Sequence, residues 1–352
     1  MIREGIQKLI EGADLTYDES GQIMSEVMSG KATNSQTAAF LTALRMKGEA
    51  VEELIAFASV MRKNCLQIRP QVHGRLVDTC GTGGDKLKTF NVSTAAAFVI
   101  AGAGISVAKH GNRSVTSKSG SADVLERLGL NLNMEPEVIQ NSIEQLGIGF
   151  MFAPAFHPAM RYAAAPRKEI GIRTVFNLLG PLTNPACANA QVLGVYDSKL
   201  TAPMACALRS LGCEEAMVVH GLDGLDEVST VGKTAIAHLK SGKIFAFEAS
   251  PRDFGIERAK IADLQVATAE ESAETILKIL KGNTRKDKKT DFVLVNSAAG
   301  IIVGGKAEDF KSGIEAARKS IESGAAYSKL KMLIETSGGD LSKLEELEVK
   351  YD

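Results

Sequence analysis

Several loops of this sequence combine glycines, hydroxyls and charges in a pattern suited to binding phosphate. The first, Gly81-Thr-Gly-Gly-Asp85, lies between a short predicted strand at 74–78 and an alanine-rich predicted helix at 94–102. Glycines let consecutive backbone N–H groups converge on an anion, and the start of the next helix adds the positive end of its dipole. We expect this loop to bind phosphate, with an ordinary tight turn as the alternative. The spacing matches neither a Walker A loop nor a complete Gly-x-Gly-x-x-Gly motif.

A second polar loop follows the predicted strand ISVA. It runs from Lys109-His-Gly-Asn-Arg113 through SVTSKSGSAD at 114–123, and it offers the cations Lys109, Arg113 and Lys118 together with several hydroxyl groups. Two such loops at neighbouring strand ends can hold two phosphate groups of one ligand. A solvated polar loop is the alternative.

An acidic pair, Asp226 and Glu227, closes a third loop after the predicted strand MVVH. Adjacent carboxylates need solvent or a cation to offset their repulsion, and phosphate ligands usually arrive with magnesium. We expect the pair to ligate Mg2+, with a solvated acidic turn as the alternative.

The segment HPAMRYAAAPRKEIGIRTVFNLLGPLTNP at 157–185 contains two candidate carboxylate-binding side chains, Arg167 and Arg173. A guanidinium group can make two parallel hydrogen bonds to a carboxylate, and residue type does not decide between the two arginines. Gly180-Pro181 predicts a rigid turn near a ligand or a domain hinge. For His110 and His157, residue type alone favours ordinary buried or capping histidines.

The elements that position these loops fall into two groups. Residues 1–67 show helical periodicity throughout, and Thr16-Tyr-Asp-Glu19 has the pattern of a capping box. After Pro70, short strands at RLVDTC, ISVAKHG, AQVLGVY and EEAMVVHG alternate with helical segments, a hairpin is predicted around Ser241-Gly242, and the last sixty residues are again helical. This order predicts an α/β fold, with a small helical domain at 1–70 and a larger domain with a mainly parallel sheet at 71–352.

Composition excludes several functional classes. The formal net charge is −1, so no bulk electrostatic field recruits nucleic acid or a membrane. No apolar run reaches the roughly 20 residues needed to span a bilayer, and the first residues form an amphipathic pattern rather than a signal peptide. We therefore expect a cytoplasmic protein without nucleic-acid or membrane partners. The five cysteines are scattered and indicate neither a disulfide framework nor a zinc site.

Taken together, the motifs GTGGD, NVST, KHGNRSVTSKSGSAD, HPAM, RKEIGIRTVFNLLGPLTNP and GLDGLDEVS resemble the anthranilate phosphoribosyltransferase family of tryptophan biosynthesis. The resemblance covers nearly the whole chain, and the motifs appear in the family's order. It implies the fold class of nucleoside phosphorylases and phosphoribosyltransferases with a helical N-terminal domain, to which about 165–185 also contributes. It implies Mg2+ as cofactor, anthranilate and phosphoribosyl pyrophosphate as substrates, and a homodimer formed through the helical domain.

The same resemblance implies roles for individual residues. Lys109, Asn112 and Arg167 are the implied catalytic residues, and Ser93, Asp226 and Glu227 are the implied metal ligands. Asn112 and Arg167 would position the aromatic acid, with His110 and Gly180 lining its tunnel. The implied phosphoribosyl pyrophosphate contacts are Gly81, Thr82, Gly83, Gly84, Asp85, Thr89, Asn91, Ser93, Thr94, Lys109, Gly111 and Ser121.

The chain departs from the family pattern after GTGGD, where Lys86-Leu-Lys88 replaces a less charged stretch. This difference concerns the mobility of the loop rather than the class of reaction.

Two rival interpretations remain at this point. A pyrimidine nucleoside phosphorylase has a similar fold and a related Lys-His loop, but the Asp226-Glu227 pair and FNLLGPLTNP favour the transferase. A non-catalytic relative that binds nucleic acid should have lost the acidic pair or the glycine loop and gained a strongly basic face. Both motifs are present here, and the net charge is close to zero.

Overall fold

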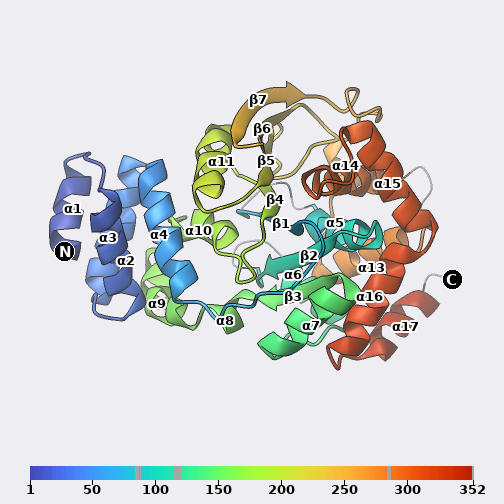
Figure 1. The fold of residues 1–352 in the computed structure, drawn as a ribbon, viewed down its shortest axis with the longest axis horizontal. Coiled ribbons are helices and arrows are strands. Elements are labelled where there is room, and N and C mark those ends of the chain that lie inside the picture. The colour runs from blue at the N-terminus through green and yellow to red at the C-terminus, as the bar shows by residue number, and fades with distance from the viewer. Residues whose placement is uncertain (84–86, 88, 115–119, 284–286, 351–352) are drawn as a thin grey trace.

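The computed structural model describes residues 1–83, 87, 89–114, 120–283 and 287–350. A helical bundle at one end of the molecule adjoins a larger part built around a single sheet (Figure 1). The predicted combination of a small helical domain and an α/β domain with a mainly parallel sheet is confirmed. The first four helices of the bundle are α1 (Ile2–Ile10), α2 (Tyr17–Met28), α3 (Asn34–Lys47) and α4 (Val51–Lys63).

Local capping interactions set where two of these helices begin. The Thr16 hydroxyl accepts the Glu19 N–H at 3.3 Å, while the Glu19 carboxylate accepts the Thr16 N–H at 2.9 Å, which confirms the predicted capping box. Thr33 and Gln36 make the same reciprocal pair at the start of α3. Each such cap contributes about 1 kcal/mol by satisfying N–H groups that have no partner within the helix.

A buried carboxylate joins three segments of the bundle. Glu53 is fully buried in α4 and accepts the backbone N–H groups of Leu15 and Ala50. Its counter-ion is Lys47, whose Nζ lies 3.0 Å away. Because a buried charge is stable only when it is paired and hydrogen-bonded, this cluster fixes the end of α3 against the start of α4.

The sheet contains seven strands in the order β3-β2-β1-β4-β5-β6-β7, and the first five in this order are parallel. The last two form the predicted antiparallel hairpin at one edge, around Ser241-Gly242. The sequence did not indicate β3, because an apolar run as short as IGFMF cannot be told from a helix segment by periodicity. The strands are β1 (Leu76–Gly81), β2 (Ser106–Gly111), β3 (Ile148–Phe152), β4 (Ala190–Gly194), β5 (Glu215–Gly221), β6 (Thr234–Lys240) and β7 (Lys243–Ala249).

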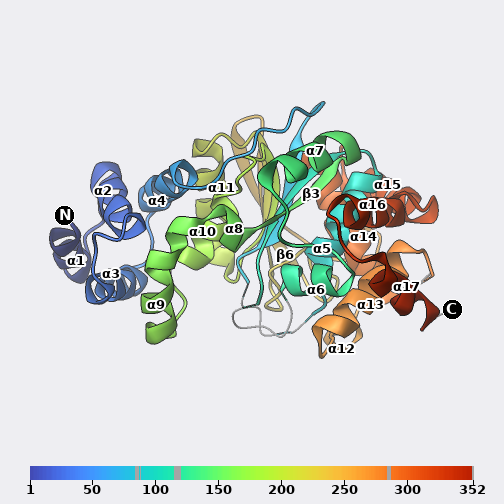
Figure 2. The ribbon, with the colours of Figure 1, turned by 90° about the horizontal axis from the view of Figure 1, so that it is seen from below.

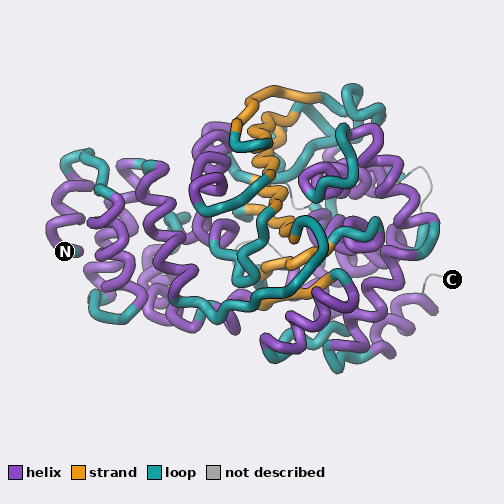
Figure 3. Tube along the Cα trace, viewed as in Figure 1, coloured by secondary structure: helices purple, strands orange, loops and turns teal. Residues whose placement is uncertain are grey.

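Helices cover both faces of the sheet (Figure 3). One face packs on α5 and α14, and the other packs on α11. Other helices pack around these. None of the helices in the described part of the chain is long and apolar enough to cross a membrane. The helices of this part are α5 (Val92–Gly102), α6 (Ser121–Arg127), α7 (Pro136–Leu146), α8 (Ala153–Phe156), α11 (Thr201–Ser210), α12 (Ile261–Leu264), α13 (Ala269–Leu280), α14 (Lys288–Val303), α15 (Phe310–Glu322), α16 (Ala325–Thr336), α17 (Leu341–Val349) and the 3-10 turns η1 (Pro158–Met160) and η2 (Ser198–Leu200).

Two further helices connect the sheet with the bundle. α9 (Arg161–Ile170) packs against α2 and α3, and α10 (Phe176–Leu182) packs against α4 (Figure 2). Gly180-Pro181 does not form the predicted turn, because both residues lie in the last turn of α10. Pro181 has no N–H group to donate within the helix, and α10 ends one residue later at Leu182.

Candidate active site

Four neighbouring parallel strands end in glycine, and the candidate site lies beyond these ends. They are Gly81 in β1, Gly111 in β2, Gly194 in β4 and Gly221 in β5. A Cβ on Gly194 would lie 1.5 Å from the carbonyl oxygen of Asp226, and one on Gly81 would lie 2.6 Å from its carboxylate. Only glycine therefore lets the third predicted loop fold back over the strand ends.

The glycine loop and the acidic loop meet at this edge of the sheet. Gly83 N–H donates to Asp226 Oδ2 at 3.0 Å, and Thr82 N–H donates to the Gly194 carbonyl at 2.9 Å. Burial raises the pKa of Asp226, and the Gly83 N–H opposes that shift. Glu227 is half-buried beside it. Gly84, Asp85, Lys86 and Lys88 lie outside the described residues.

The start of α5 faces the same region. Asn91 is the N-cap residue of this helix, and the Ser93 carbonyl accepts the Thr79 hydroxyl at 2.8 Å. The Thr94 hydroxyl is buried and has no hydrogen-bond partner within the described part of the chain. Thr89 pairs with Gln265 in an isolated bridge. The helix therefore presents the positive end of its dipole near the glycine loop.

Lys109 is almost completely buried at the end of β2. Its Nζ donates to the Thr79 carbonyl at 2.6 Å. Burial lowers the pKa of Lys109, while the negative charges of Asp78 and Glu227 oppose that shift. The ammonium group thus lies between two strands, within electrostatic reach of the acidic pair.

In the loop after β2, a charged side chain pairs with nearby residues of the same segment rather than facing a ligand. The Asn112 carbonyl accepts the Ser121 hydroxyl at 3.4 Å, so both ends of the loop are in contact. Arg113, which the sequence offered as a phosphate-binding cation, instead forms ion pairs with Asp123 at 3.0 Å and Glu126 at 2.7 Å. These carboxylates lie in the first and second turns of α6, and residue type alone does not indicate which cation they would pair with. Lys118 lies outside the described residues.

Of the predicted acceptor residues, His110 lies beside a second buried histidine, His157, and near Gly180. The rings of His110 and His157 have centroids 5.1 Å apart, and burial lowers their pKa values to about 3 and about 4. A backbone interaction with Gly180 opposes the shift at His110. A Cβ added to Gly180 would meet nothing within 4 Å, so this residue borders open space.

The two candidate arginines lie in different surroundings. The Arg167 guanidinium lies 5.1 Å from the Phe176 ring centroid, and burial lowers its pKa. Arg173 lies 4.1 Å from the Tyr196 ring centroid. Both rings supply cation–π contacts that hold a guanidinium without neutralising it.

Tyr196 is a site residue that the sequence did not indicate. Its N–H donates to the Thr82 hydroxyl at 3.2 Å, and its own hydroxyl accepts from Arg45 of α3 at 3.3 Å. With Arg173 on its ring, it joins the helical bundle to the glycine loop. The partners lie far apart in the sequence, so no local signal could have identified it.

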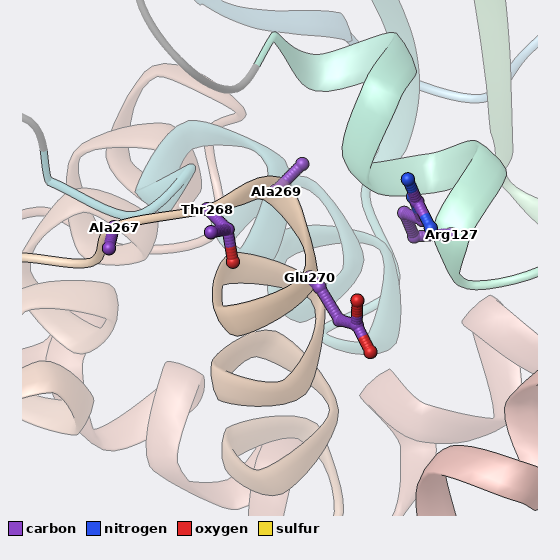
Figure 4. Close-up of a pocket in the computed structure, with 5 residues that line it drawn as sticks. All are labelled: Arg127, Ala267, Thr268, Ala269 and Glu270. Carbon is purple, nitrogen blue, oxygen red and sulfur yellow. The ribbon is translucent and has the colours of Figure 1, made fainter.

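A cavity of about 480 Å³ lies elsewhere, at the start of α13. Figure 4 shows Arg127 of α6 opposite Glu270 across this cavity. The first turn of α13 carries two carboxylates, Glu270 and Glu271, which disfavours an anion there. The cavity therefore does not compete with the strand ends as the phosphate site.

The donor set at the strand ends fits magnesium rather than a transition metal. The described residues contain no group of three or more His, Cys, Asp or Glu side chains arranged to hold a metal ion. Magnesium is commonly bound through one or two carboxylates together with substrate phosphates. Asp226 and Glu227 supply such a pair.

Comparison with known proteins places this arrangement in a class. A family model described as glycosyl transferase family, helical bundle domain, matches residues 3–65, and one described as glycosyl transferase family, a/b domain, matches residues 73–327. The fold and the loops at its strand ends therefore define a glycosyl transferase built from a helical bundle and an α/β part.

Individual relatives identify the family within this class of transferases. The anthranilate phosphoribosyltransferase of Alkaliphilus metalliredigens is 51% identical over 338 residues, covering 96% of this chain and 98% of that protein. The crystal structure of the Thermus thermophilus enzyme matches with a TM-score of 0.89 at 41% identity, covering 95% and 99% of the two chains. The Saccharomyces cerevisiae enzyme in complex with PRPP and Mg matches with a TM-score of 0.87 at 29% identity, covering 96% and 98%. The chain belongs to the anthranilate phosphoribosyltransferase family.

The contact between Gly194 and Asp226 generates a first prediction. Replacing Gly194 with alanine places a methyl group against the Asp226 carbonyl oxygen, so the acidic loop must move. Displacement of about 1 Å at an active site can cost about 100-fold in rate, and we expect a loss of this order in kcat/KM for phosphoribosyl transfer. Gly21→Ala is the matched control, because its new methyl would meet only Val60 at 3.9 Å. Unchanged kinetics in Gly194→Ala would contradict the geometry.

The buried histidines generate a second prediction, on stability against pH. Their folded pKa values of about 3 and about 4 lie below the unfolded value, so between pH 7 and pH 5 the unfolded chain binds more protons and stability falls as pH falls. The expected loss is about 2 kcal/mol for each histidine over that interval. Urea unfolding at both pH values should show a smaller loss in His110→Asn/His157→Asn than in the wild type. The exposed His73→Asn variant serves as control, and equal losses in all three proteins would refute the assignment.

Proposed function

We propose that this chain transfers the 5-phosphoribosyl group from phosphoribosyl pyrophosphate to the amine of anthranilate and releases pyrophosphate, a step of tryptophan biosynthesis. The observation that carries the proposal is the hydrogen bond from Gly83 N–H to Asp226 Oδ2 at 3.0 Å. It joins an anion-binding loop to an acidic pair across 143 residues of sequence. A phosphorylated sugar with a bound Mg2+ ion requires both groups at one place.

The donor substrate is proposed to lie over the ends of β1 and β2. Backbone N–H groups of the glycine loop and the dipole of α5 favour the negative phosphate groups. The unpartnered Thr94 hydroxyl at the start of α5 supports a polar ligand there. The residues proposed to contact this substrate are Gly81, Thr82, Gly83, Gly84, Asp85, Thr89, Asn91, Ser93, Thr94, Lys109, Gly111 and Ser121.

Mg2+ is the cofactor, and Asp226, Glu227 and Ser93 are the residues proposed to hold it. The raised pKa of the buried Asp226 supports this assignment, because a carboxylate in that position gains stability from a nearby cation. When bound, the ion stabilises negative charge on the pyrophosphate group.

Anthranilate is proposed to occupy the open space beside Gly180. Arg167 and Asn112 would bind its carboxylate, and the rings of His110 and His157, neutral at neutral pH, would border the aromatic acid. The open space next to Gly180 and the low pKa values of both histidines support this placement.

The reaction itself demands an electrophilic sugar carbon rather than a strong base. An aromatic amine is a weak nucleophile, so departure of pyrophosphate gives a transition state with oxocarbenium character. Lys109 would stabilise the charge that develops on the leaving group, and Arg167 would hold the amine opposite to it. Closure of the helical bundle over the strand ends would exclude competing water. No general base is assigned, because the amine loses its proton only after it has bonded.

We also propose a homodimer that forms through the helical domain, taken as residues 1–70 with a contribution from about 165–185, while residues 71–352 form the phosphoribosyl pyrophosphate-binding domain. Two apolar side chains of the bundle are well exposed, Ile10 at 67% and Met46 at 83%, which supports a partner on this side. The cytoplasmic location remains a prediction from the sequence.

The acidic pair provides the test of the proposed function. In the wild type, anthranilate fluorescence should fall only when phosphoribosyl pyrophosphate and Mg2+ are both added, and EDTA should abolish the change. The isosteric variant Asp226→Asn/Glu227→Gln should lose on the order of 100-fold or more in kcat, because charge stabilisation of a leaving group is commonly of this size. Wild-type kinetics in a folded double variant would remove the pair from the metal site, and an inactive wild type would refute the function.

The choice between the two arginines gives a separate prediction. Arg167→Ala should raise the KM for anthranilate by an amount equivalent to about 1.5–3 kcal/mol, the contribution of a hydrogen bond to a charged group. Arg173→Ala is the control, since it removes an equal charge that stacks on Tyr196. If instead only Arg173→Ala raises this constant, Arg173 binds the carboxylate.

A further inference from the structure

The strands β1 and β2 pair for only part of their length. Their register pairs Leu76 with Ser106 and Val77 with Val107, and it ends there. Both strands nevertheless continue to Gly81 and Gly111. In the same region β1 remains paired with β4 up to Gly81. The backbone ladder between β1 and β2 is therefore interrupted at the end of the sheet that faces the candidate site.

Side chains satisfy backbone groups that this interruption of the ladder leaves unpaired. Asp78 is fully buried, and its Oδ1 accepts the His110 N–H at 3.2 Å. Asn184 donates from Nδ2 to Asp78 Oδ2 and to the Ala108 carbonyl, both at 2.8 Å. Lys109 Nζ donates to the Thr79 carbonyl at 2.6 Å. An unsatisfied backbone group in this interior would be destabilising, so these contacts stabilise the interrupted part of the ladder.

Asp78 also supplies the negative charge with the largest effect on a buried cation, Lys109. The charge of Asp78 opposes the effect of burial on the pKa of Lys109, and Lys109 does the same for Asp78. A buried ammonium group stays charged only when such a partner offsets its desolvation. The carboxylate thus acts on the cation proposed to stabilise the leaving group.

We propose that Asp78 and Asn184 are positioning residues for phosphoribosyl transfer. They bridge β1 and β2 where the backbone ladder is interrupted, keep Lys109 charged beside them, and fix His110 and the segment after α10 around the reacting groups. The inference rests on the proposed function, because the roles of Lys109 and His110 come from it. Neither Asp78 nor Asn184 is among the residues proposed to touch a substrate or the metal.

The variant Asp78→Asn tests the inference at constant shape. The new amide has one oxygen and one NH2 group facing two donors, so one contact becomes repulsive and the negative charge is lost. We expect kcat of the folded protein to fall by about 30-fold or more, with a smaller change in either KM and no change in the Mg2+ concentration needed for half-maximal activity. An effect on kcat above that on KM indicates loss of an interaction made in the transition state.

The matched control is Glu53→Gln, the same kind of change at another fully buried carboxylate, in the helical bundle. It should lower the urea midpoint of unfolding and leave kcat within about twofold of the wild type, because a structural role changes stability alone. Asn184→Ala should lower kcat by about 10-fold, and the double variant Asp78→Asn/Asn184→Ala should lose less than the sum of the two effects, because the facing NH2 group is gone.

The results separate this inference from the proposed function. A folded Asp78→Asn variant with wild-type kcat, or with a loss no larger than that of Glu53→Gln, would overturn the inference alone. If Asp78→Asn does not fold, Asn184→Ala decides, and wild-type kcat in that protein would overturn the inference. A wild type that does not consume anthranilate would overturn the proposed function and this inference with it.

Discussion

The close approach of the Asp226 loop to the ends of β1 and β4 is the constraint on which the site depends. The Asp226 carbonyl occupies the place where a Cβ of residue 194 would be, and its carboxylate lies where a Cβ of residue 81 would crowd it. Glycine at these strand ends is thus a steric requirement. It brings an anion-binding loop and an acidic pair together, which neither loop could achieve alone. The site is thus formed by several loops that meet at one edge of the sheet, not by any one motif.

Burial then determines the charge of each group at that edge. It raises the pKa of Asp226 and lowers those of Lys109 and His110, in each case because low-dielectric surroundings disfavour the charged form. The carboxylates and the lysine offset one another, whereas no carboxylate among the described residues opposes the lowered pKa values of His110 and His157. Asp226 and Lys109 thus form a charged part of this edge, next to two histidines whose lowered pKa values favour the neutral form.

The helical bundle is not an independent attachment to the sheet. One hydrophobic cluster runs from Phe40 and Phe57 of the bundle to Met204 of α11 and to Leu193 and Val218 of the sheet. Through Tyr196, the bundle also reaches the glycine loop. The bundle thus contacts the edge of the sheet that carries the candidate site.

The sequence by itself determined the features that depend on neighbouring residues: the Thr16 capping box, the hairpin at Ser241-Gly242, the alternation of strands and helices, and the motifs that identify the family. Only the tertiary structure decided that Arg113 pairs with acids on α6, that IGFMF is a strand, and that Asp78 and Asn184 satisfy the groups between β1 and β2. The reason is physical. Capping and turn formation depend on local conformation, whereas the partner of a charge or an unpaired backbone group is chosen by segments that approach one another only after the chain has folded.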